Sequence, residues 1–588
     1  MWWRALCVCL LAAAATPAAV AVACGRKPPK KEEGTPGSRP AVINTTPTPS
    51  SSNQTTTPEN PVVNTPAGSI RGSWMETRRG RRFQAYRGIR YAKPPIGKLR
   101  FKPPVPIVQY KEEVDASKEG PACPLVAPAS YYVDEDCLTI NVYTPTTNRS
   151  ARLPVVFFIH PGGFYSMTGR SDLAGPHYLL DKNLIFVSIN YRLAALGFLS
   201  TGDELAPGNN GMKDQVMALR WVQRNIAAFG GDPDRVTIAG VSAGSISVML
   251  HMISPMTKGL FHRGIAISAS PIGKEPMPHH QLDLAIKQAH ILSCPTNSSQ
   301  AIVDCLVEKP WKELGDSYPK FFQYAFDPVG LWKPVVELDF GQERYLTIEP
   351  TEAITKGLIH TVPLIVSQTT DEFAGLAFPI LSNATLIHRM NTHWESTAAI
   401  SFDLPRRHLR EAARALRGAY LADRDLANDD FSKKQLGTLY GDAIVGFPTH
   451  RMANLMCKHS KHPVWYYEFA YVGAQSHTLD PATKKPVGAA HHDDMLYLLS
   501  LRYRFQDIPV SNSSDSAMVD SMTAVWYNFA RYGAPDARED TPELSSMKWP
   551  QMKPESREYL VFDKKFEVRK GLKEDRFKLW EELYPLWV

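Results

Sequence analysis

Runs of consecutive apolar residues recur along the chain and are bounded by polar or turn-forming residues. Two examples are Leu153 to His160 and Leu184 to Asn190. Continuous apolar runs of this length are typical of strands that a parallel sheet buries on both faces. Further strands are expected at Val62 to Ser73, Phe83 to Tyr91, Cys137 to Tyr143, Arg235 to Ala239, Gly264 to Ser268, Leu364 to Ser367 and Val464 to Phe469.

Other segments place apolar residues at helical spacing. From Met212 to Phe229 they recur every three or four residues, and Gly230-Gly231 follows as a stop signal. Further helices are expected at Ile246 to Ile253, Met518 to Tyr532 and Arg576 to Leu583. Because strands alternate with helices, the pattern predicts an α/β fold with a large, mostly parallel central sheet flanked by helices.

The N-terminal part of the chain differs in composition from the rest. Arg4 precedes an apolar run that ends in Ala21-Val22-Ala23, which is typical of a secretory signal peptide; an uncleaved membrane anchor is the alternative. Residues 24–62 are rich in Lys, Pro, Ser, Thr and Asn, and they contain too little apolar surface to offset their ordering entropy. We therefore expect a signal peptide at 1–23, a disordered segment at 24–62 and one α/β domain at 63–588.

The composition is that of an ordinary globular protein, with 44% hydrophobic and 21% charged residues among 588. The formal net charge of +7 is small for this length, and the basic excess lies in local runs such as Arg78 to Arg82. A nucleic-acid-binding protein needs a basic face on a recognisable module, so no nucleic-acid partner is expected. The C-terminal region contains no apolar segment long enough to span a bilayer, so we expect no transmembrane segment after signal cleavage.

Several Asn-X-Ser/Thr sequons, together with the signal peptide, predict a secreted, extracellular glycoprotein. They lie at Asn44, Asn53, Asn148, Asn297, Asn383 and Asn512. An oxidising compartment also favours two local disulfides, Cys123–Cys137 and Cys294–Cys305. Of the cysteines outside the signal segment, Cys24 and Cys457 remain, and Cys457 is expected to be a buried free thiol.

The most informative motif is Gly240-Val241-Ser242-Ala243-Gly244. It matches G-x-S-x-G, in which a serine occupies a strained turn between a strand and a helix, and small neighbours allow the turn to close. The serine hydroxyl is then exposed at the N-terminus of the helix. Because a strand is expected before the motif and a helix after it, Ser242 is the predicted nucleophile.

A second glycine-containing motif, His160-Pro161-Gly162-Gly163-Phe164, directly follows the buried strand that starts at Leu153. Acyl transfer requires N–H groups that stabilise a negatively charged oxygen, and each such donor lowers the barrier by about 3 kcal/mol. The expected donors of this oxyanion hole are the N–H groups of Gly162, Gly163 and Ala243. Pro161 has no N–H and is therefore not a donor.

A nucleophilic serine needs a general base and a carboxylate that orients the base, in the chain order Ser, Asp or Glu, His. Asp371 and Glu372 follow an apolar strand after a short polar turn, at the sheet edge where this architecture builds its site. His491 and His492 lie farther along, in a segment rich in small residues. Spacing alone does not decide between the two carboxylates or between the two histidines.

These motifs resemble those of the cholinesterase/type-B carboxylesterase family, and the chain is most similar to arthropod carboxylesterases within it. The resemblance covers residues from about Val63 to the C-terminus. It is carried by Arg87 to Pro95, by Glu135 to Tyr143 and most specifically by Asn209 to Gly244, which contains Gly-Gly-Asp-Pro before the serine motif.

The resemblance implies an α/β-hydrolase fold and a secreted serine esterase that hydrolyses small-molecule carboxylic esters without a metal or organic cofactor. It implies Ser242 as nucleophile, Glu372 as acid, His491 as base, and Gly162, Gly163 and Ala243 as oxyanion donors. It also implies the disulfides Cys123–Cys137 and Cys294–Cys305, and it leaves Cys457 unpaired.

The chain departs from the family pattern beside each reacting group. Val241 stands where Glu is usual, Phe373 and His492 stand where Gly is usual, and Pro161 stands where Gly is common. These departures leave every reacting group in place but affect the expected substrate range and rate.

Three alternatives remain beside a general carboxylesterase. A cholinesterase recognises a quaternary ammonium group with aromatic faces, but the loop between Cys123 and Cys137 has only Tyr131 and Tyr132 and no tryptophan. A juvenile-hormone-type esterase usually has Gln in place of Val241. A non-catalytic adhesion or binding protein of this superfamily normally lacks a reacting group and carries a transmembrane helix, whereas this sequence keeps all three reacting groups.

Overall fold

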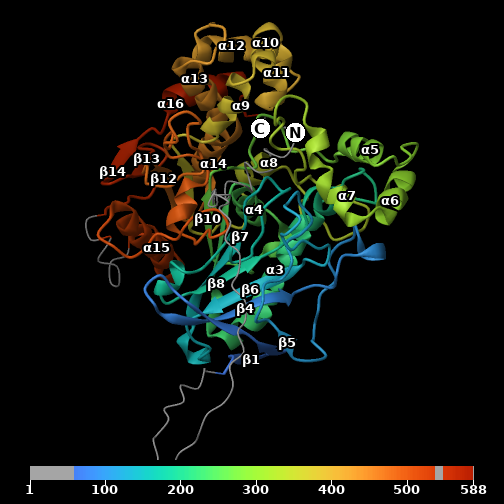
Figure 1. Cartoon of the computed structure of the whole chain (residues 1–588), viewed down its shortest axis with the longest axis vertical. Coiled ribbons are helices and arrows are strands. Elements are labelled where there is room, and N and C mark those ends of the chain that lie inside the picture. The colour runs from blue at the N-terminus through green and yellow to red at the C-terminus, as the bar shows by residue number, and fades with distance from the viewer. Residues whose placement is uncertain (1–58, 537–543, 545–546, 587–588) are drawn as a thin grey trace, which may run out of the picture. The chain divides into compact units, whose positions relative to one another are not determined.

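One large sheet dominates the part of the chain that the structure, a computed structural model, describes: residues 59–536, 544 and 547–586. Within these residues the sheet has 11 strands in the order β14-β13-β12-β11-β10-β9-β7-β8-β6-β4-β3 (Figure 1). Neighbouring strands from β13 through β8 are parallel, and antiparallel strands complete both edges. The predicted mostly parallel α/β sheet is therefore confirmed.

The strands of this sheet are β3 (Ser73–Glu76), β4 (Arg82–Arg90), β6 (Thr139–Thr144), β7 (Leu153–Ile159), β8 (Ile185–Ile189), β9 (Gly231–Val241), β10 (Arg263–Ile267), β11 (Leu364–Thr369), β12 (Val464–Phe469), β13 (Glu558–Phe562) and β14 (Phe566–Lys570). A smaller three-stranded sheet contains β1 (Val62–Thr65), β2 (Gly68–Arg71) and β5 (Val114–Asp115).

Most predicted strands are present, with two instructive differences. The segment Val62 to Ser73 contains two separate strands, because Thr65, Pro66, Ala67 and Gly68 turn the chain and pair β1 with β2. Strand β9 starts at Gly231, four residues before the predicted Arg235, because Gly231 already pairs with Leu153 of β7. Val62, the last residue of the segment predicted to be disordered, already belongs to β1.

The α-helices of the described residues are α2 (Ala194–Phe198), α3 (Asn210–Asn225), α4 (Ala243–His251), α5 (Leu282–Ile291), α6 (Ser299–Glu308), α7 (Trp311–Asp316), α8 (Pro350–Thr355), α9 (Ala377–Leu381), α10 (Ala384–Thr392), α11 (Trp394–Ser401), α12 (Leu409–Leu421), α13 (Asp430–Gly441), α14 (Phe447–His459), α15 (Ser514–Tyr532) and α16 (Glu574–Leu583). The predicted helix at 212–229 is α3 followed by a 3₁₀ turn, and the predicted helix at 246–253 begins earlier, at Ala243.

Helices cover the sheet and also form a second apolar core. Helices α4, α14 and α15 pack on the parallel strands, and α15 contributes Trp526 and Phe529 to the core around the sheet. Helices α9 to α14, together with α16, bury a separate group of side chains that includes Trp394, Tyr440 and Trp580. Figure 1 shows α10 to α13 gathered at one end of the picture.

The described part of the chain contains both expected disulfides and one free cysteine, and it exposes the described sequons. Disulfides join Cys123 to Cys137 and Cys294 to Cys305. Cys457 is a free thiol but only half-buried, with Sγ 3.3 Å from the Met552 carbonyl, so the expectation of a buried thiol was wrong. The sequons whose asparagines are described are exposed: Asn148, Asn297, Asn383 and Asn512.

The remaining N-terminal predictions lie outside the described residues. They are the signal peptide at 1–23, the segment from 24 to 58, Cys24, and the sequons at Asn44 and Asn53. Across the described ranges, no helix combines the length and apolarity needed to cross a membrane.

Candidate active site

Ser242 occupies a sharp turn between β9 and α4. Its backbone has φ 56° and ψ −117°, an uncommon conformation for a residue with a side chain, and its N–H donates to the Ile267 carbonyl over 2.8 Å. Glycines make this turn possible. A Cβ on Gly240 would lie 2.2 Å from the Gly244 carbonyl oxygen, and one on Gly244 would lie 2.1 Å from the Ile159 carbonyl oxygen. The turn thus presents Ser242 half-buried at the N-terminus of α4.

The turn after β7 carries the predicted oxyanion donors. Gly162 and Gly163 both have positive φ, 111° and 58°, and a Cβ on Gly162 would lie 2.2 Å from the Ser166 carbonyl oxygen. Their N–H groups donate no hydrogen bond to any described residue. Ala243 is the first residue of α4, so its N–H has no acceptor within the helix. Three backbone donors are therefore free at the two turns that end β7 and β9.

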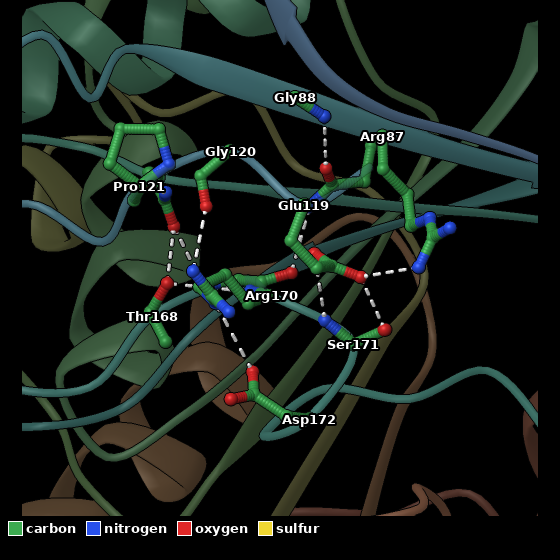
Figure 2. A network of polar contacts seen from close by, with 12 residues as sticks. Arg87, Gly88, Glu119, Gly120, Pro121, Thr168, Arg170, Ser171 and Asp172 are labelled. Atoms are coloured by element: carbon green, nitrogen blue, oxygen red, sulfur yellow. Dashed lines mark hydrogen bonds and ion pairs between the residues drawn. The ribbon is translucent and has the colours of Figure 1, made fainter. Parts of the chain in front are cut away.

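A polar network holds the chain that continues from this turn (Figure 2). Arg170 donates from Nη1 to the Gly120 carbonyl over 2.9 Å, and the Ser171 hydroxyl donates to Glu119 over 2.5 Å. Glu119 also pairs with Arg87 of β4, 3.0 Å away. The network ties the segment after the turn to strand β4 and to the residues before Cys123.

The predicted acid and base are in direct contact. Nδ1 of His491 is hydrogen-bonded to Oε2 of Glu372, and the other carboxylate oxygen accepts the Thr369 N–H over 2.8 Å. Both side chains are buried. Burial raises the pKa of the Glu372 carboxyl, but the charge and hydrogen bond of His491 outweigh it, so the pKa lies below its ordinary value. Glu372 is therefore an anion that holds His491 by its Nδ1 edge.

Two short connections bring these residues together from distant parts of the chain. Asp371 forms an isolated parallel bridge with Ala490, and its N–H donates to the Ala489 carbonyl over 3.0 Å. Glu372 follows Asp371 and His491 follows Ala490, so the bridge brings the acid and the base side by side. Asp493 then closes the histidine segment, because its carboxylate accepts the Ala490 N–H over 2.9 Å.

Sequence spacing left Asp371 and His492 as alternatives, and the structure separates them from the pair. The Asp371 carboxylate accepts the Thr370 hydroxyl over 2.6 Å. Nε2 of His492 is buried and has no hydrogen-bond partner in the described part of the chain. Burial lowers the pKa of His492 well below its ordinary value, and the charge of His491 adds to the effect. Among these four residues, the carboxylate-imidazole contact is made by Glu372 and His491.

Ser242 and the Glu372–His491 pair leave the sheet at the same edge. Strands β9, β10 and β11 are parallel neighbours, and Ser242 and Glu372 follow the first and third of them. Two strand spacings separate their starting points by about 10 Å. Nε2 of His491 is buried and, among the described residues, has no hydrogen-bond partner, so its proton-accepting position is unoccupied by protein groups.

Two aromatic rings contact His491, and a buried carboxylate lies farther along the same segment. The His491 ring stacks on Phe373, with centroids 4.2 Å apart, and lies 4.0 Å from the His492 ring. Asp494 is fully buried, and neither of its carboxylate oxygens has a hydrogen-bond partner within the described chain. Burial raises the pKa of Asp494 to about 8, with a further contribution from the charge of Glu372. The departures at Phe373 and His492 marked two of these positions, but no spacing rule marked Asp494.

A cavity of about 350 Å³ lies beside the acid. Its lining includes Asp371, Glu372, Lys573 and Arg576 but neither Ser242 nor His491. The cavity therefore contacts Glu372 but is not lined by Ser242 or His491. In the described residues, no group of three or more His, Cys, Asp or Glu side chains is arranged to hold a metal ion.

Aromatic side chains continue from the oxyanion turn. Tyr165 stacks on Tyr318 with ring centroids 3.8 Å apart, and Tyr318 contacts Phe322, which in turn contacts Phe326. This cluster forms an apolar wall next to Gly163, because a Cβ on Gly163 would lie 2.4 Å from the Tyr165 ring.

Comparisons with known proteins identify the family of the chain. The model of the carboxylesterase family matches residues 59–580. Juvenile hormone esterase of Tribolium castaneum is 36% identical over 507 residues, which are 82% of this chain and 85% of that protein. Venom carboxylesterase-6 of Apis mellifera is 33% identical over 512 residues, 84% of this chain and 88% of that protein.

A solved structure is similar over most of the chain. It is the crystal structure of juvenile hormone esterase from Manduca sexta with OTFP covalently attached. The TM-score is 0.77 at 27% sequence identity, and the match covers 90% of this chain and 100% of that chain.

Proposed function

The chain belongs to the carboxylesterase family and is a carboxylic ester hydrolase, and from that premise we propose that it is secreted and acts through an acyl-enzyme on Ser242. The observation that carries the mechanism is the buried Glu372–His491 hydrogen bond, with Nε2 of His491 left without a protein partner. A base oriented in this way, at the sheet edge that also carries a strained serine, is the arrangement that serine acyl transfer requires.

The reaction has two acyl-transfer steps. Nε2 of His491 accepts the Ser242 hydroxyl proton as Oγ attacks the ester carbonyl, and the carbonyl oxygen becomes an oxyanion. The intermediate collapses, the alcohol leaves with the proton from His491, and the acyl group remains on Oγ. Water then attacks the acyl-enzyme with His491 again as base, which releases the carboxylic acid and restores Ser242.

Backbone dipoles and one carboxylate supply the electrostatic stabilisation. The N–H groups of Gly162, Gly163 and Ala243 stabilise the oxyanion. A Cβ on Gly162 would collide with backbone and one on Gly163 with the Tyr165 ring, so this turn has no room for a further side chain. Glu372 stabilises the imidazolium that forms when His491 takes the proton. The negative charge on the oxyanion and the positive charge on the imidazolium are therefore each stabilised by a group of the protein.

A quaternary ammonium substrate fits this chain poorly. In the loop closed by Cys123–Cys137, the Arg170 guanidinium lies over the Tyr131 ring, 4.9 Å from its centroid. That aromatic face is already occupied by a cation, and Tyr132 is exposed. Without another aromatic residue in the loop to bind an ammonium group, a general carboxylic ester is the better substrate class.

Juvenile hormone is a second candidate substrate. It is favoured by the similarity to the juvenile hormone esterases of Tribolium castaneum and Manduca sexta, and by the apolar wall around Tyr165 and Tyr318. Competition between juvenile hormone and a short-chain aryl ester at equal concentrations gives the ratio of their kcat/KM values. A ratio well above one supports the hormone as substrate, and a ratio below one supports the general esterase.

Purified full-length protein tests the mechanism with a short-chain aryl ester and a fluorophosphonate probe. We expect wild type to turn over the ester and to carry one covalent label on Ser242. Ser242→Ala should lose the label and at least a thousandfold of kcat. Turnover or labelling that persists in Ser242→Ala overturns the assignment, and wild type that neither reacts nor labels overturns the serine mechanism.

A further inference from the structure

The imidazole of His491 contacts two aromatic rings, one from each neighbouring segment. The Phe373 ring is stacked on it, with centroids 4.2 Å apart and planes inclined by 28°. The His492 ring lies 4.0 Å away and is inclined by 34°. Phe373 immediately follows the acid in sequence, and His492 immediately follows the base. Both contacts therefore involve the face of the ring. Its Nδ1 is left to Glu372, and its Nε2 has no hydrogen-bond partner among the described residues.

Both residues adopt a backbone conformation that favours glycine. Phe373 has φ 51° and His492 has φ 76°, and each directly precedes a 3₁₀ helix, Ala374–Leu376 and Asp493–Tyr497. Side chains with a Cβ are disfavoured in this region, and such residues concentrate at functional sites. Here glycine would fit the backbone better, yet two rings are present and both contact the same imidazole.

We propose that Phe373 and His492 are positioning residues that hold the ring plane of His491 while Glu372 holds its Nδ1 edge. This inference rests on the proposed function of His491 as general base. A hydrogen bond to one nitrogen leaves the imidazole free to tilt about that bond. Contacts on the ring face remove this freedom and keep Nε2 directed at the Ser242 hydroxyl, as proton transfer requires.

The two rings also suit the charge that His491 acquires. The face of the Phe373 ring attracts an imidazolium, because the aromatic quadrupole is negative on that face. His492 is neutral near pH 7, because burial and nearby charges hold its pKa well below the ordinary value. It therefore adds no second positive charge beside the imidazolium. Glu372 and His477 also have charge interactions with His491.

Paired substitutions distinguish the effect of losing the aromatic ring from the effect of changing the side-chain volume. Phe373→Leu and His492→Leu put an apolar side chain of similar length in place of the ring, whereas Phe373→Tyr and His492→Phe keep a ring. Phe101→Leu is the matched control, because Phe101 is buried, has φ 58° and lies outside the site. Fluorophosphonate titration gives the concentration of active sites, so that kcat refers to folded enzyme only.

We expect each leucine variant to lower kcat about fivefold with KM unchanged, since stacked aromatic pairs contribute roughly that factor. Both ring-preserving variants and Phe101→Leu should stay within about twofold of wild type by the same reasoning. Phe373→Leu should also shift the acid limb of kcat/KM to lower pH by about 0.5 unit, because the imidazolium loses an attractive face. If Phe373→Leu does not fold, Phe373→Met gives the same comparison.

Equal kcat values per active site in the leucine and ring-preserving variants would overturn the positioning role, and so would an unmoved pH profile in Phe373→Leu. A failure of the positioning role can be distinguished from a failure of the proposed function. If Ser242→Ala retains turnover, the nucleophile assignment fails whatever Phe373 does. If Ser242→Ala is inactive but the leucine variants match wild type, only the role of the two rings fails.

Discussion

In the proposed mechanism a single carboxylate, that of Glu372, orients the base, so the loss of its charge should have a large effect on the rate. Glu372→Gln keeps the side-chain shape but removes the charge that stabilises the His491 imidazolium. It also places an amide where the Nδ1 proton needs an acceptor. We expect kcat to fall about 10³- to 10⁴-fold with KM nearly constant. Steady-state kinetics with an aryl ester, normalised to active sites, measure this loss.

Asp371→Asn is the neighbouring control for this charge effect. Asp371 is also partly buried, but its carboxylate bonds to Thr370 instead of an imidazole. Its variant should keep kcat within about fivefold, as expected for a group outside the proton-transfer path. Comparable losses in both variants would show that general disturbance of the segment, and not the lost anion, lowers the rate.

Asp494 gives a pH-dependent stability with a definite sign. Its folded pKa is raised to about 8, whereas an unfolded aspartate titrates near 4. Between these values the unfolded chain has lost its proton and the folded protein keeps it. The free energy of unfolding therefore falls as pH rises, by up to about 1.4 kcal/mol per pH unit from this group. Below pH 4 the effect is absent.

Asp494→Asn should remove that slope. Urea unfolding at several pH values between 5 and 8 gives the difference in unfolding free energy between wild type and variant. The variant should gain stability over wild type as pH rises through this range. Asp423→Asn, at an exposed side chain, should follow the wild-type slope. Parallel curves for Asp494→Asn and wild type would contradict a buried, protonated Asp494.

The residues that sequence identified are those with local signatures. Ser242 lies in a motif whose spacing follows from a strand-to-helix turn, and Gly162 lies directly after a buried strand. Glu372 and His491 needed the resemblance to separate them from Asp371 and His492, because adjacent residues have the same spacing to every motif. The ring contacts of Phe373 and His492 depend on backbone dihedral angles and on two segments meeting, which no local pattern encodes.

At the scale of elements, the turn between β9 and α4 requires that residue 244 has no Cβ atom. A Cβ on Gly244 would lie 2.1 Å from the Ile159 carbonyl oxygen, at the end of β7. Neither β7 nor α4 can move to make room for this Cβ without displacing Ser242. Gly244→Ala should therefore lower the unfolding free energy by about 2–4 kcal/mol and also lower kcat. Urea unfolding and active-site titration measure the two effects.

Gly418→Ala in α12 is the matched substitution at an unstrained glycine. The nearest atom to its Cβ would be 3.6 Å away, which is ordinary contact. Alanine in a helix interior should raise stability by about 0.5–1 kcal/mol, since it restricts the unfolded chain. A stable Gly244→Ala enzyme with normal kcat would show that the turn between β9 and α4 tolerates a side chain.

Strands and helices could be predicted where the element is fully buried or buries one face, because apolar residues then recur at regular spacing. The apolar strands β7, β8, β10 and β12 were found to within two residues at each end. Helix α12 was not identified, although Leu409, Ala412, Ala413, Leu416 and Tyr420 have helical spacing, so a signal was present. By contrast, the edge strands β3 and β14 are short and partly exposed, and pairing with a distant neighbour makes them strands.

At the scale of the whole molecule, the sheet order explains why the site is built from distant segments. Strands β9, β10 and β11 are adjacent in space, but more than 100 residues separate β9 from β11 in the sequence. Residues after their carboxyl ends meet at one edge, as expected for open parallel sheets. Helices α9 to α14, together with α16, form the second core.

Features spread over the whole chain predict that the protein passes through the secretory pathway. Disulfides at Cys123–Cys137 and Cys294–Cys305, and exposed sequons at Asn148, Asn297, Asn383 and Asn512, are features that need an oxidising, glycosylating compartment. The N-terminal pattern predicts cleavage after Ala23. Expressed in insect cells, the full chain should appear in the medium with Cys24 as its first residue, and glycosidase treatment should lower its mass. A chain lacking residues 1–23 should stay in the cells without glycan. Full-length protein that remains in the membrane fraction with its N-terminus intact would instead establish the apolar run as an anchor.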